Sequence, residues 1–153
     1  MEDMIEGVVI KDLVSFKDKR GWLKEIYRRD EDSITPEMCY VSHTSLHQIR
    51  GPHEHAKQSD FFVFGGPGDF ELYLWDNRSK SSTHGNHEKI IVGESRNVSV
   101  LVPPGVVHGY KSITDGGSFS INLPDKLYAG FGRKEEVDEI RHENDSTSKF
   151  RIT

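Results

Sequence analysis

Short apolar runs alternate with turns that contain glycine and proline along most of this chain, and this pattern favours β-strands over helices. Within single runs the apolar residues recur at every second position, as Phe70, Leu72 and Leu74 do, so one face of each strand is predicted to be buried. We therefore expect an all-β protein with little helix. The expected strands cover residues 7–11, 22–28, 38–46, 59–65, 69–76, 88–93, 98–103, 108–113, 118–122 and 149–152.

Two glycine-rich turns indicate how the strands are connected. Residues 65–68 (Gly-Gly-Pro-Gly) and 115–117 (Asp-Gly-Gly) each separate two expected strands, and such turns favour antiparallel pairing of their neighbours. The one helical candidate is the highly charged segment 133–143. Many short antiparallel strands joined in this way indicate a sandwich or barrel, and among these a jelly roll.

Composition excludes several classes of function. The chain has 153 residues, which fits a single domain over residues 1–153. Its net charge is -5 at pH 7, so it lacks the basic character of proteins that bind nucleic acid. No apolar run approaches the ~18 residues that a membrane-spanning helix needs, and the amino terminus has no signal-peptide pattern. We expect a protein without nucleic-acid or membrane partners.

Cysteine usage points to a reducing compartment. Cys39 is the only cysteine, so no disulfide can form within the chain. It lies in the apolar run 38–41, where a buried structural thiol is expected. Together with the absence of a signal pattern, this predicts a cytoplasmic protein.

Three histidines at predicted strand ends are the main candidates for chemistry. His53 and His55 are two positions apart, so on a strand both side chains face the same side. His108 follows a Pro-Pro-Gly turn that can direct it toward the same interior. In one interpretation, these histidines bind a divalent metal together with Asp60 or Gln58, since imidazole and carboxylate suit iron, manganese or zinc. In a second, one histidine is a general base and the others bind substrate; in a third, all are structural.

Four segments resemble, in order, successive motifs of the dTDP-4-dehydrorhamnose 3,5-epimerase family. They are residues 18–25 (Asp-Lys-Arg-Gly-Trp-Leu-Lys-Glu), 49–53 (Ile-Arg-Gly-Pro-His), 76–85 (Asp-Asn-Arg-Ser-Lys-Ser-Ser-Thr-His-Gly) and 104–110 (Pro-Gly-Val-Val-His-Gly-Tyr). The resemblance extends over residues 7–128 and is greatest to the short branch found in surface or spore-coat polysaccharide gene clusters. It implies a cupin-type jelly-roll barrel (double-stranded β-helix), a homodimer in which an N-terminal strand crosses to the partner, and catalysis without a metal or other cofactor.

The family's reaction explains the residue types at these positions. The ketone of a dTDP-4-keto-6-deoxyhexose acidifies the hydrogens on C3 and C5, so the enzyme needs a base, a proton donor and a group that holds the enolate oxygen. The resemblance places the base at His53. Asp76 matches a site aspartate of the family and is our candidate for the carboxylate that orients His53, with Glu71 as an alternative. It places Arg20 at the nucleotide diphosphate, for which guanidinium is a natural clamp. The other substrate-binding positions that it implies are Glu25, Arg50, His55, Lys57, Arg78, His108, Asn122 and Tyr128.

The chain departs from the family pattern at two catalytic positions. The proton-donating tyrosine of the family would fall near Ile121 or Asn122, and no tyrosine is there. Residues 58–61 stand where the family has its enolate-stabilising lysine, which leaves Lys57 as the substitute. Outside their motifs, Arg20 and Arg78 would be interpreted as ordinary surface ion-pair partners.

Three classes of function therefore stay open. The first is an epimerase that inverts one or both carbons in polysaccharide or deoxysugar biosynthesis. The second is a metal-dependent cupin enzyme with the ligands His53, His55, Asp60 and His108. The third is a non-catalytic protein that binds a sugar nucleotide. Nucleotide specificity is expected to depend on stacking and strand-end contacts, for which the candidates are Tyr40, Ser42, Thr44 and His47.

Overall fold

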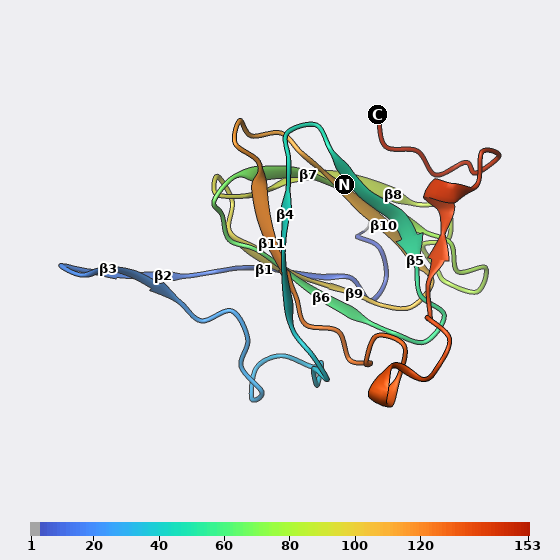
Figure 1. Cartoon of the computed structure of the whole chain (residues 1–153), viewed down its shortest axis with the longest axis horizontal. Helices are drawn as coiled ribbons and strands as arrows, with labels where there is room; N and C mark the ends of the chain where they lie inside the picture. Colours follow the sequence, from blue (N-terminus) through green and yellow to red (C-terminus); the bar gives the residue numbers. More distant parts are fainter. Residues whose placement is uncertain (1–3) are drawn as a thin grey trace.

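The computed structural model describes residues 4–153, which form two five-stranded sheets and a separate hairpin (Figure 1). The first sheet has the order β1-β9-β6-β11-β4 and contains β1 (Val9–Asp12), β9 (Val98–Val102), β6 (Asp60–Phe64), β11 (Ser118–Asn122) and β4 (Tyr40–Thr44). The second has the order β12-β5-β10-β7-β8 and contains β12 (Ile140–Arg141), β5 (Ile49–Glu54), β10 (Val106–Ser112), β7 (Asp69–Asp76) and β8 (His87–Gly93). The hairpin pairs β2 (Ser15–Asp18) with β3 (Gly21–Lys24). These pairings are antiparallel, as expected.

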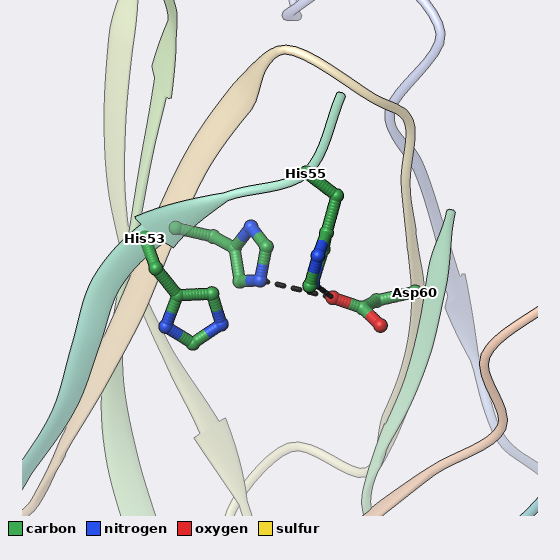
Figure 2. A group of neighbouring side chains, drawn as sticks. His53, His55 and Asp60 are labelled. Carbon is green, nitrogen blue, oxygen red and sulfur yellow. Dashed lines mark hydrogen bonds and ion pairs between the residues drawn. The ribbon is translucent and has the colours of Figure 1, made fainter. Parts of the chain in front are cut away.

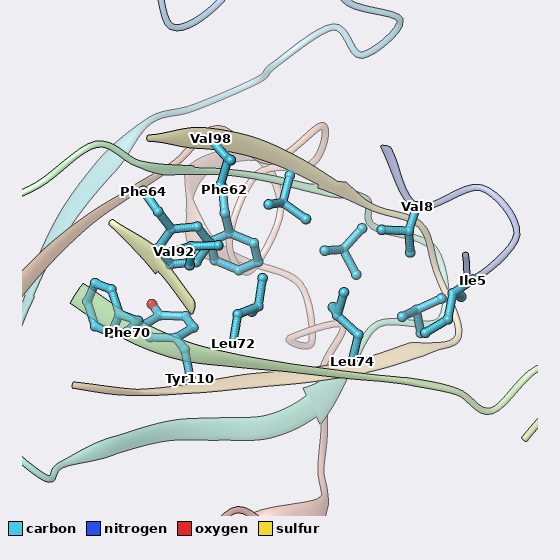
Figure 3. Packing of buried hydrophobic residues seen from close by; sticks show 13 residues of the cluster. Ile5, Val8, Phe62, Phe64, Phe70, Leu72, Leu74, Val92, Val98 and Tyr110 are labelled. Carbon is cyan, nitrogen blue, oxygen red and sulfur yellow. The ribbon is translucent and has the colours of Figure 1, made fainter. Parts of the chain in front are cut away.

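An apolar core fills the space between the two sheets (Figure 3). Phe62 and Phe64 of β6 point into this core, and Leu72 and Leu74 of β7 reach it from the other sheet. Each of these four side chains is at most 2% exposed, and burial of one such side chain contributes about 1.5–3 kcal/mol to the free energy of unfolding. The alternation predicted for residues 69–76 is therefore confirmed.

The turns at 65–68 and 115–117 differ from the expectation. They join β6 to β7 and β10 to β11, and in both cases the two strands belong to different sheets. β6 pairs with β9 and β11, whereas β7 pairs with β10 and β8. The prediction that these turns connect hydrogen-bonded neighbours is therefore wrong. A glycine turn sets the local change of direction, but the buried pattern of both sheets decides which strands pair.

Other differences occur where a strand is polar or a loop is apolar. The structure contains β5, which the sequence pattern does not predict because Gly51 and Pro52 normally weaken a strand. The pattern does not predict β2 either, because its residues are mostly exposed. The strand expected at 22–28 ends at Lys24, and no strand forms at 149–152.

No α-helix forms at 133–143 or elsewhere in residues 4–153. A 3₁₀ turn at Phe131–Arg133, the short strand β12 and a second 3₁₀ turn at His142–Asn144 take its place. This part of the chain has no apolar face that packing could use to stabilise a helix. Across the same described residues, no helix is long and apolar enough to cross a membrane.

Cys39 is exposed, so the prediction of a buried thiol is wrong. It lies directly before β4, which forms an edge of the first sheet. Tyr40 and Val41 are exposed on the same strand, and the apolar run therefore covers a sheet edge instead of filling the core.

The β2–β3 hairpin projects away from the two sheets (Figure 1). It exposes three large apolar side chains, with relative exposures of 56% for Phe16, 64% for Trp22 and 60% for Leu23. The hairpin therefore contributes little to the apolar core of its own chain.

Gly51 allows β5 to approach β10 closely. Its φ is +84°, and a Cβ at this position would lie 2.7 Å from the carbonyl oxygen of His108. Gly85 has a similar φ of +87°, but a Cβ there would meet nothing within 4 Å.

These two glycines provide a matched test of the close approach. We predict that Gly51→Ala lowers the free energy of unfolding by more than about 3 kcal/mol and Gly85→Ala by about 1–2 kcal/mol, because only the first adds a backbone clash to the positive-φ strain. Urea unfolding of both variants measures the difference. Equal losses of unfolding free energy in the two variants would show that the clash does not contribute to the destabilisation.

Candidate active site

β5 and β10 bring three histidines together in the interior. His53 on β5 is paired with His108 on β10, and their ring centroids are 4.6 Å apart. His55 follows β5, and its ring centroid lies 5.6 Å from that of His53 (Figure 2). The structure thus joins the three side chains that the sequence predicts to meet.

The carboxylate of Asp60 is the centre of this group. Its Oδ2 lies 3.0 Å from His55 Nε2 and 3.1 Å from His108 Nε2. Its Oδ1 accepts hydrogen bonds of 2.9 Å from the side-chain amides of Gln58 and Asn122. The contact with His108 is electrostatic, because that Nε2 lies close to Oδ2 but outside hydrogen-bond geometry. Burial alone would raise the pKa of Asp60, but its contacts with His108 and His55 hold it well below the usual value.

His53 and His55 are held in opposite protonation states. Burial and the neighbouring imidazoles of His108 and His55 lower the pKa of His53 to about 2. Burial also acts to lower the pKa of His55, but Asp60 and the carbonyl group of Asp138 outweigh it and raise that pKa to about 9. At neutral pH the imidazole of His53 is therefore neutral and that of His55 is charged.

The segment after β11 forms one wall of a cavity of about 720 Å³, a volume in the range of small-molecule sites. Asp138 anchors this wall, because its carboxylate accepts hydrogen bonds of 2.9 Å from the backbone N–H groups of residues 56–58. Four of the nine predicted binding residues line the same cavity, and so does the predicted base, His53. The four are Arg50, His55, Lys57 and Tyr128. His108 and Asn122 are buried and belong to the group through Asp60.

The carboxylate beside His53 belongs to Glu139, which the sequence analysis missed. Its Oε1 lies 3.7 Å from His53 Nδ1. Glu71, one expected partner of His53, instead lies 2.7 Å from the ammonium group of Lys89. Glu139 stands in the charged segment 133–143, beyond the residues that carry the family resemblance, and such a run is typical of a solvated surface.

Asp76 does not orient His53, and this expectation is corrected. Its buried carboxylate accepts hydrogen bonds from Arg78 Nε at 2.8 Å and from the hydroxyl groups of Ser81 and Thr83 at 2.6 Å each. Neither Asp76 nor Arg78 lines the cavity. Arg78 therefore forms an ion pair with Asp76, as expected for this arginine outside its motif.

Arg20 and Glu25 lie away from the cavity of their own chain. Arg20 is at the turn of the β2–β3 hairpin, where its side chain is 83% exposed and pairs with Asp18. Glu25 follows β3 and lies 3.4 Å from Arg28. Neither residue lines the cavity, so a role in substrate binding requires a second chain.

Two facing antiparallel sheets with a polar group of histidines and a carboxylate between them define a cupin-type jelly roll with an interior site. The family model for dTDP-4-dehydrorhamnose 3,5-epimerase matches residues 2–143, and the chain belongs to this family. The resemblance in the sequence and the expected fold are confirmed, and family membership makes the protein an enzyme of the sugar-epimerase class.

Individual relatives agree with this assignment. The probable low-salt glycan biosynthesis epimerase Agl13 of Haloferax volcanii is 36% identical over 127 residues, and 81% of each chain is covered. The spore coat polysaccharide biosynthesis protein SpsL of Bacillus subtilis is 33% identical over 110 residues, which cover 71% of this chain and 72% of SpsL. The dTDP sugar isomerase of Desulfovibrio desulfuricans G20 has the same fold with a TM-score of 0.81 at 19% identity, over 93% of this chain and 87% of that one.

The contacts of Asp76 predict a role in stability. Asp76→Asn should lower the free energy of unfolding by about 3 kcal/mol at neutral pH, because Arg78 keeps its charge and loses its partner. Burial alone would raise the pKa of Asp76, but hydrogen bonds from Arg78, Ser81 and Thr83 outweigh it and hold the pKa below the ordinary value of 3.8. The stabilisation is therefore complete above that ordinary value and is lost as the pH falls through the lower pKa of the folded state.

Urea unfolding from neutral to acidic pH measures this effect as the difference between the wild type and Asp76→Asn. The difference should shrink as the pH falls below 3.8, the ordinary pKa of the carboxyl group. Asp115→Asn, in an exposed turn, is the control and should change stability little at any pH. A difference for Asp76→Asn that stays constant with pH would contradict the assigned ion pair.

Proposed function

We propose that the cavity binds a dTDP-4-keto-6-deoxyhexose and that His53 removes the hydrogen from C3 or C5, next to the C4 ketone. The observation that carries this proposal is the position of the His53 imidazole, which lines the cavity and has Glu139 Oε1 3.7 Å from its Nδ1. A neutral imidazole can accept a proton, and the carboxylate stabilises the imidazolium that forms. His53 is also the residue at which the family resemblance places the base.

This chemistry needs no cofactor. When the proton leaves the carbon, its electron pair moves toward the C4 oxygen and forms an enolate, and a proton that arrives on the other face gives the epimer. Arg50 and Lys57 line the cavity and supply positive charge, to which the imidazolium of His55 adds. We therefore propose a cofactor-independent isomerase that acts at one or both carbons, in polysaccharide or deoxysugar biosynthesis.

Individual basic side chains in the cavity lining support a nucleotide diphosphate as the bound group. The whole chain carries a net charge of -5, which disfavours nucleic acid as a partner. The cavity lining contains acidic residues of the segment 135–143, but it also contains Arg50, Lys57, Lys126 and Arg133, and such side chains bind phosphate oxygens. We place this activity in the cytoplasm, in keeping with the single cysteine of the sequence.

The role of His53 predicts the behaviour of one variant. His53→Asn should reduce the incorporation of solvent deuterium at C3 and C5 of dTDP-4-keto-6-deoxyglucose by at least about 100-fold, because an amide cannot accept the proton. Binding of dTDP should change little. Proton NMR in deuterium oxide measures incorporation, with His87→Asn on the exposed part of β8 as the control.

The same measurement separates two classes of function. Incorporation that persists in His53→Asn would place the base at another residue. A wild-type protein that binds dTDP but incorporates no deuterium would instead be a non-catalytic binding protein.

A specific observation favours a metal-dependent cupin enzyme as the second candidate. The side chains of this group offer donor atoms that all lie within 4.8 Å of one another, from His53, His55, Asp60 and His108. Among the described residues, the buried Nε2 of His108 has no hydrogen-bond partner, and such an atom can serve as a ligand. Three imidazoles and a carboxylate suit iron, manganese or zinc.

Metal analysis of protein purified without added metal tests this alternative. A stoichiometric metal whose removal by a chelator also stops deuterium incorporation would support the metal enzyme. Trace metal, with incorporation unchanged after chelation, would support the cofactor-independent mechanism.

We propose a homodimer in which the β2–β3 hairpin of each chain crosses to the partner and helps to form its site. Its exposed Phe16, Trp22 and Leu23 support this assembly, because contact with a second chain would bury them. The exposed guanidinium of Arg20 at the hairpin turn would then bind the substrate diphosphate in the partner's cavity.

Hybrid dimers test the exchange. Arg20→Ala should weaken binding of dTDP more than it slows the chemistry, whereas Lys19→Ala at the same exposed turn is the control. When Arg20→Ala and His53→Asn chains are mixed and allowed to re-associate, each hybrid dimer gains one site with both wild-type residues. Activity of the mixture above the sum of its parts is expected, and its absence would contradict the crossing hairpin.

A further inference from the structure

We propose that the hydroxyl group of Tyr40 donates the proton to the substrate carbon on the face opposite His53. This assignment rests on the proposed epimerase function and identifies the proton donor of that reaction. Inversion needs a proton-handling group on each face of the carbon, because a base that returns a proton to its own face restores the original configuration. The acid must therefore come from a wall that faces His53.

β11 does not supply this acid. Ile121 packs on the outer side of its sheet against the cluster that contains Phe61 and Val63. Asn122 faces the interior, and its amide is not an acid. Its Nδ2 instead donates hydrogen bonds of 2.9 Å to the Tyr40 hydroxyl oxygen and to the carboxylate of the buried group. Asn122 and Tyr40 are direct partners across β11 and β4, so the phenol reaches the site from the neighbouring strand.

Tyr40 and His53 approach the cavity from opposing sheets. β4 is an edge of the first sheet, β5 belongs to the second, and both residues line the cavity. The connection 45–48 joins the two strands, and Arg50 Nε donates a hydrogen bond of 2.8 Å to Thr44 Oγ1 near this connection. From this hydrogen bond, β5 continues along the chain to His53, and β4 extends in the opposite direction along the chain to Tyr40. Both side chains line the same cavity of about 720 Å³, which has room for a sugar ring.

The protonation state and the hydrogen bonding of the Tyr40 hydroxyl group suit a proton donor. Tyr40 is 42% exposed, but the partial burial of its phenol group raises its pKa to about 12, so the phenol keeps its hydrogen at working pH. Its oxygen accepts the bond from Asn122, and within residues 4–153 no acceptor is assigned to the phenol hydrogen. That hydrogen is therefore available to a ligand in the cavity.

The other two tyrosines of the cavity are placed less favourably. Tyr110 is 4% exposed, packs against Phe62 and Phe70, and its hydroxyl oxygen is 3.2 Å from the hydroxyl group of Ser120. Tyr128 lies on the wall formed by the segment after β11, which also carries Glu139, the carboxylate beside His53. Tyr40 is the tyrosine that comes from the sheet opposite His53 and has an oriented hydroxyl group.

The proton balance of the step closes without a co-reactant. His53 takes the proton from C3 or C5, and the electron pair of that bond forms the enolate. Tyr40 then gives its proton to the other face of the same carbon, where the electron pair of the enolate forms the new C–H bond. The phenolate regains a proton from water and the imidazolium of His53 returns one to water, so nothing is oxidised or reduced.

Tyr40→Phe tests the assignment, because proton removal and inversion have separate readouts. Deuterium incorporation with retained configuration should continue through His53, whereas formation of the epimer should fall at least about 100-fold. Tyr73→Phe removes the same hydroxyl group outside the cavity, where Tyr73 stacks on Trp75, and should leave both readouts unchanged. Tyr40→His introduces a different acid and should restore part of the inversion with an altered pH dependence.

Each outcome decides for or against Tyr40. Undiminished epimer formation in Tyr40→Phe would overturn the assignment, and so would the joint loss of incorporation and inversion in a folded variant. Thermal unfolding shows whether Tyr40→Phe is folded; if it is not, inversion by Tyr40→His with the wild-type pH dependence overturns the assignment. Failure of the proposed function looks different, because then the wild type incorporates no deuterium or His53→Asn keeps incorporating it.

Discussion

One buried carboxylate, that of Asp60, holds together the elements that form the interior site. Its oxygens lie within 3.1 Å of His55 after β5, His108 on β10 and Asn122 on β11, and therefore join the two sheets. A carboxylate buried without such partners would cost several kcal/mol of folding free energy. The positions of these side chains are thus fixed by the stability of the fold as well as by its chemistry.

His53 makes no hydrogen bond or ion pair to this carboxylate, although its ring packs 4.6 Å from that of His108. Asp60 and Asp138 keep the neighbouring His55 charged, and that charge helps to keep His53 neutral. In the proposed mechanism, structural support and proton transfer are therefore divided between two histidines that are two positions apart.

The sequence predicted the parts of the fold that depend on local periodicity. The alternation at Phe70, Leu72 and Leu74 placed β7, and the spacing of His53 and His55 placed both side chains in the interior. Strand partners were not predictable from the turns at 65–68 and 115–117, because pairing depends on which faces are buried together. Glu139 was not predictable because its place beside His53 depends on a long-range anchor, the bonds of Asp138 to the backbone of residues 56–58.

The turns at 65–68 and 115–117 carry the chain from one sheet to the other, and the cavity is lined from both sheets, by β4 and β6 on one wall and by β5 and β10 on the other. A sugar held between these walls meets a separate set of side chains on each side. A substitution on one wall consequently changes the environment of one ring face while the opposite face keeps its own. A scaffold of this kind therefore permits the handedness of a product to change through substitutions on a single wall.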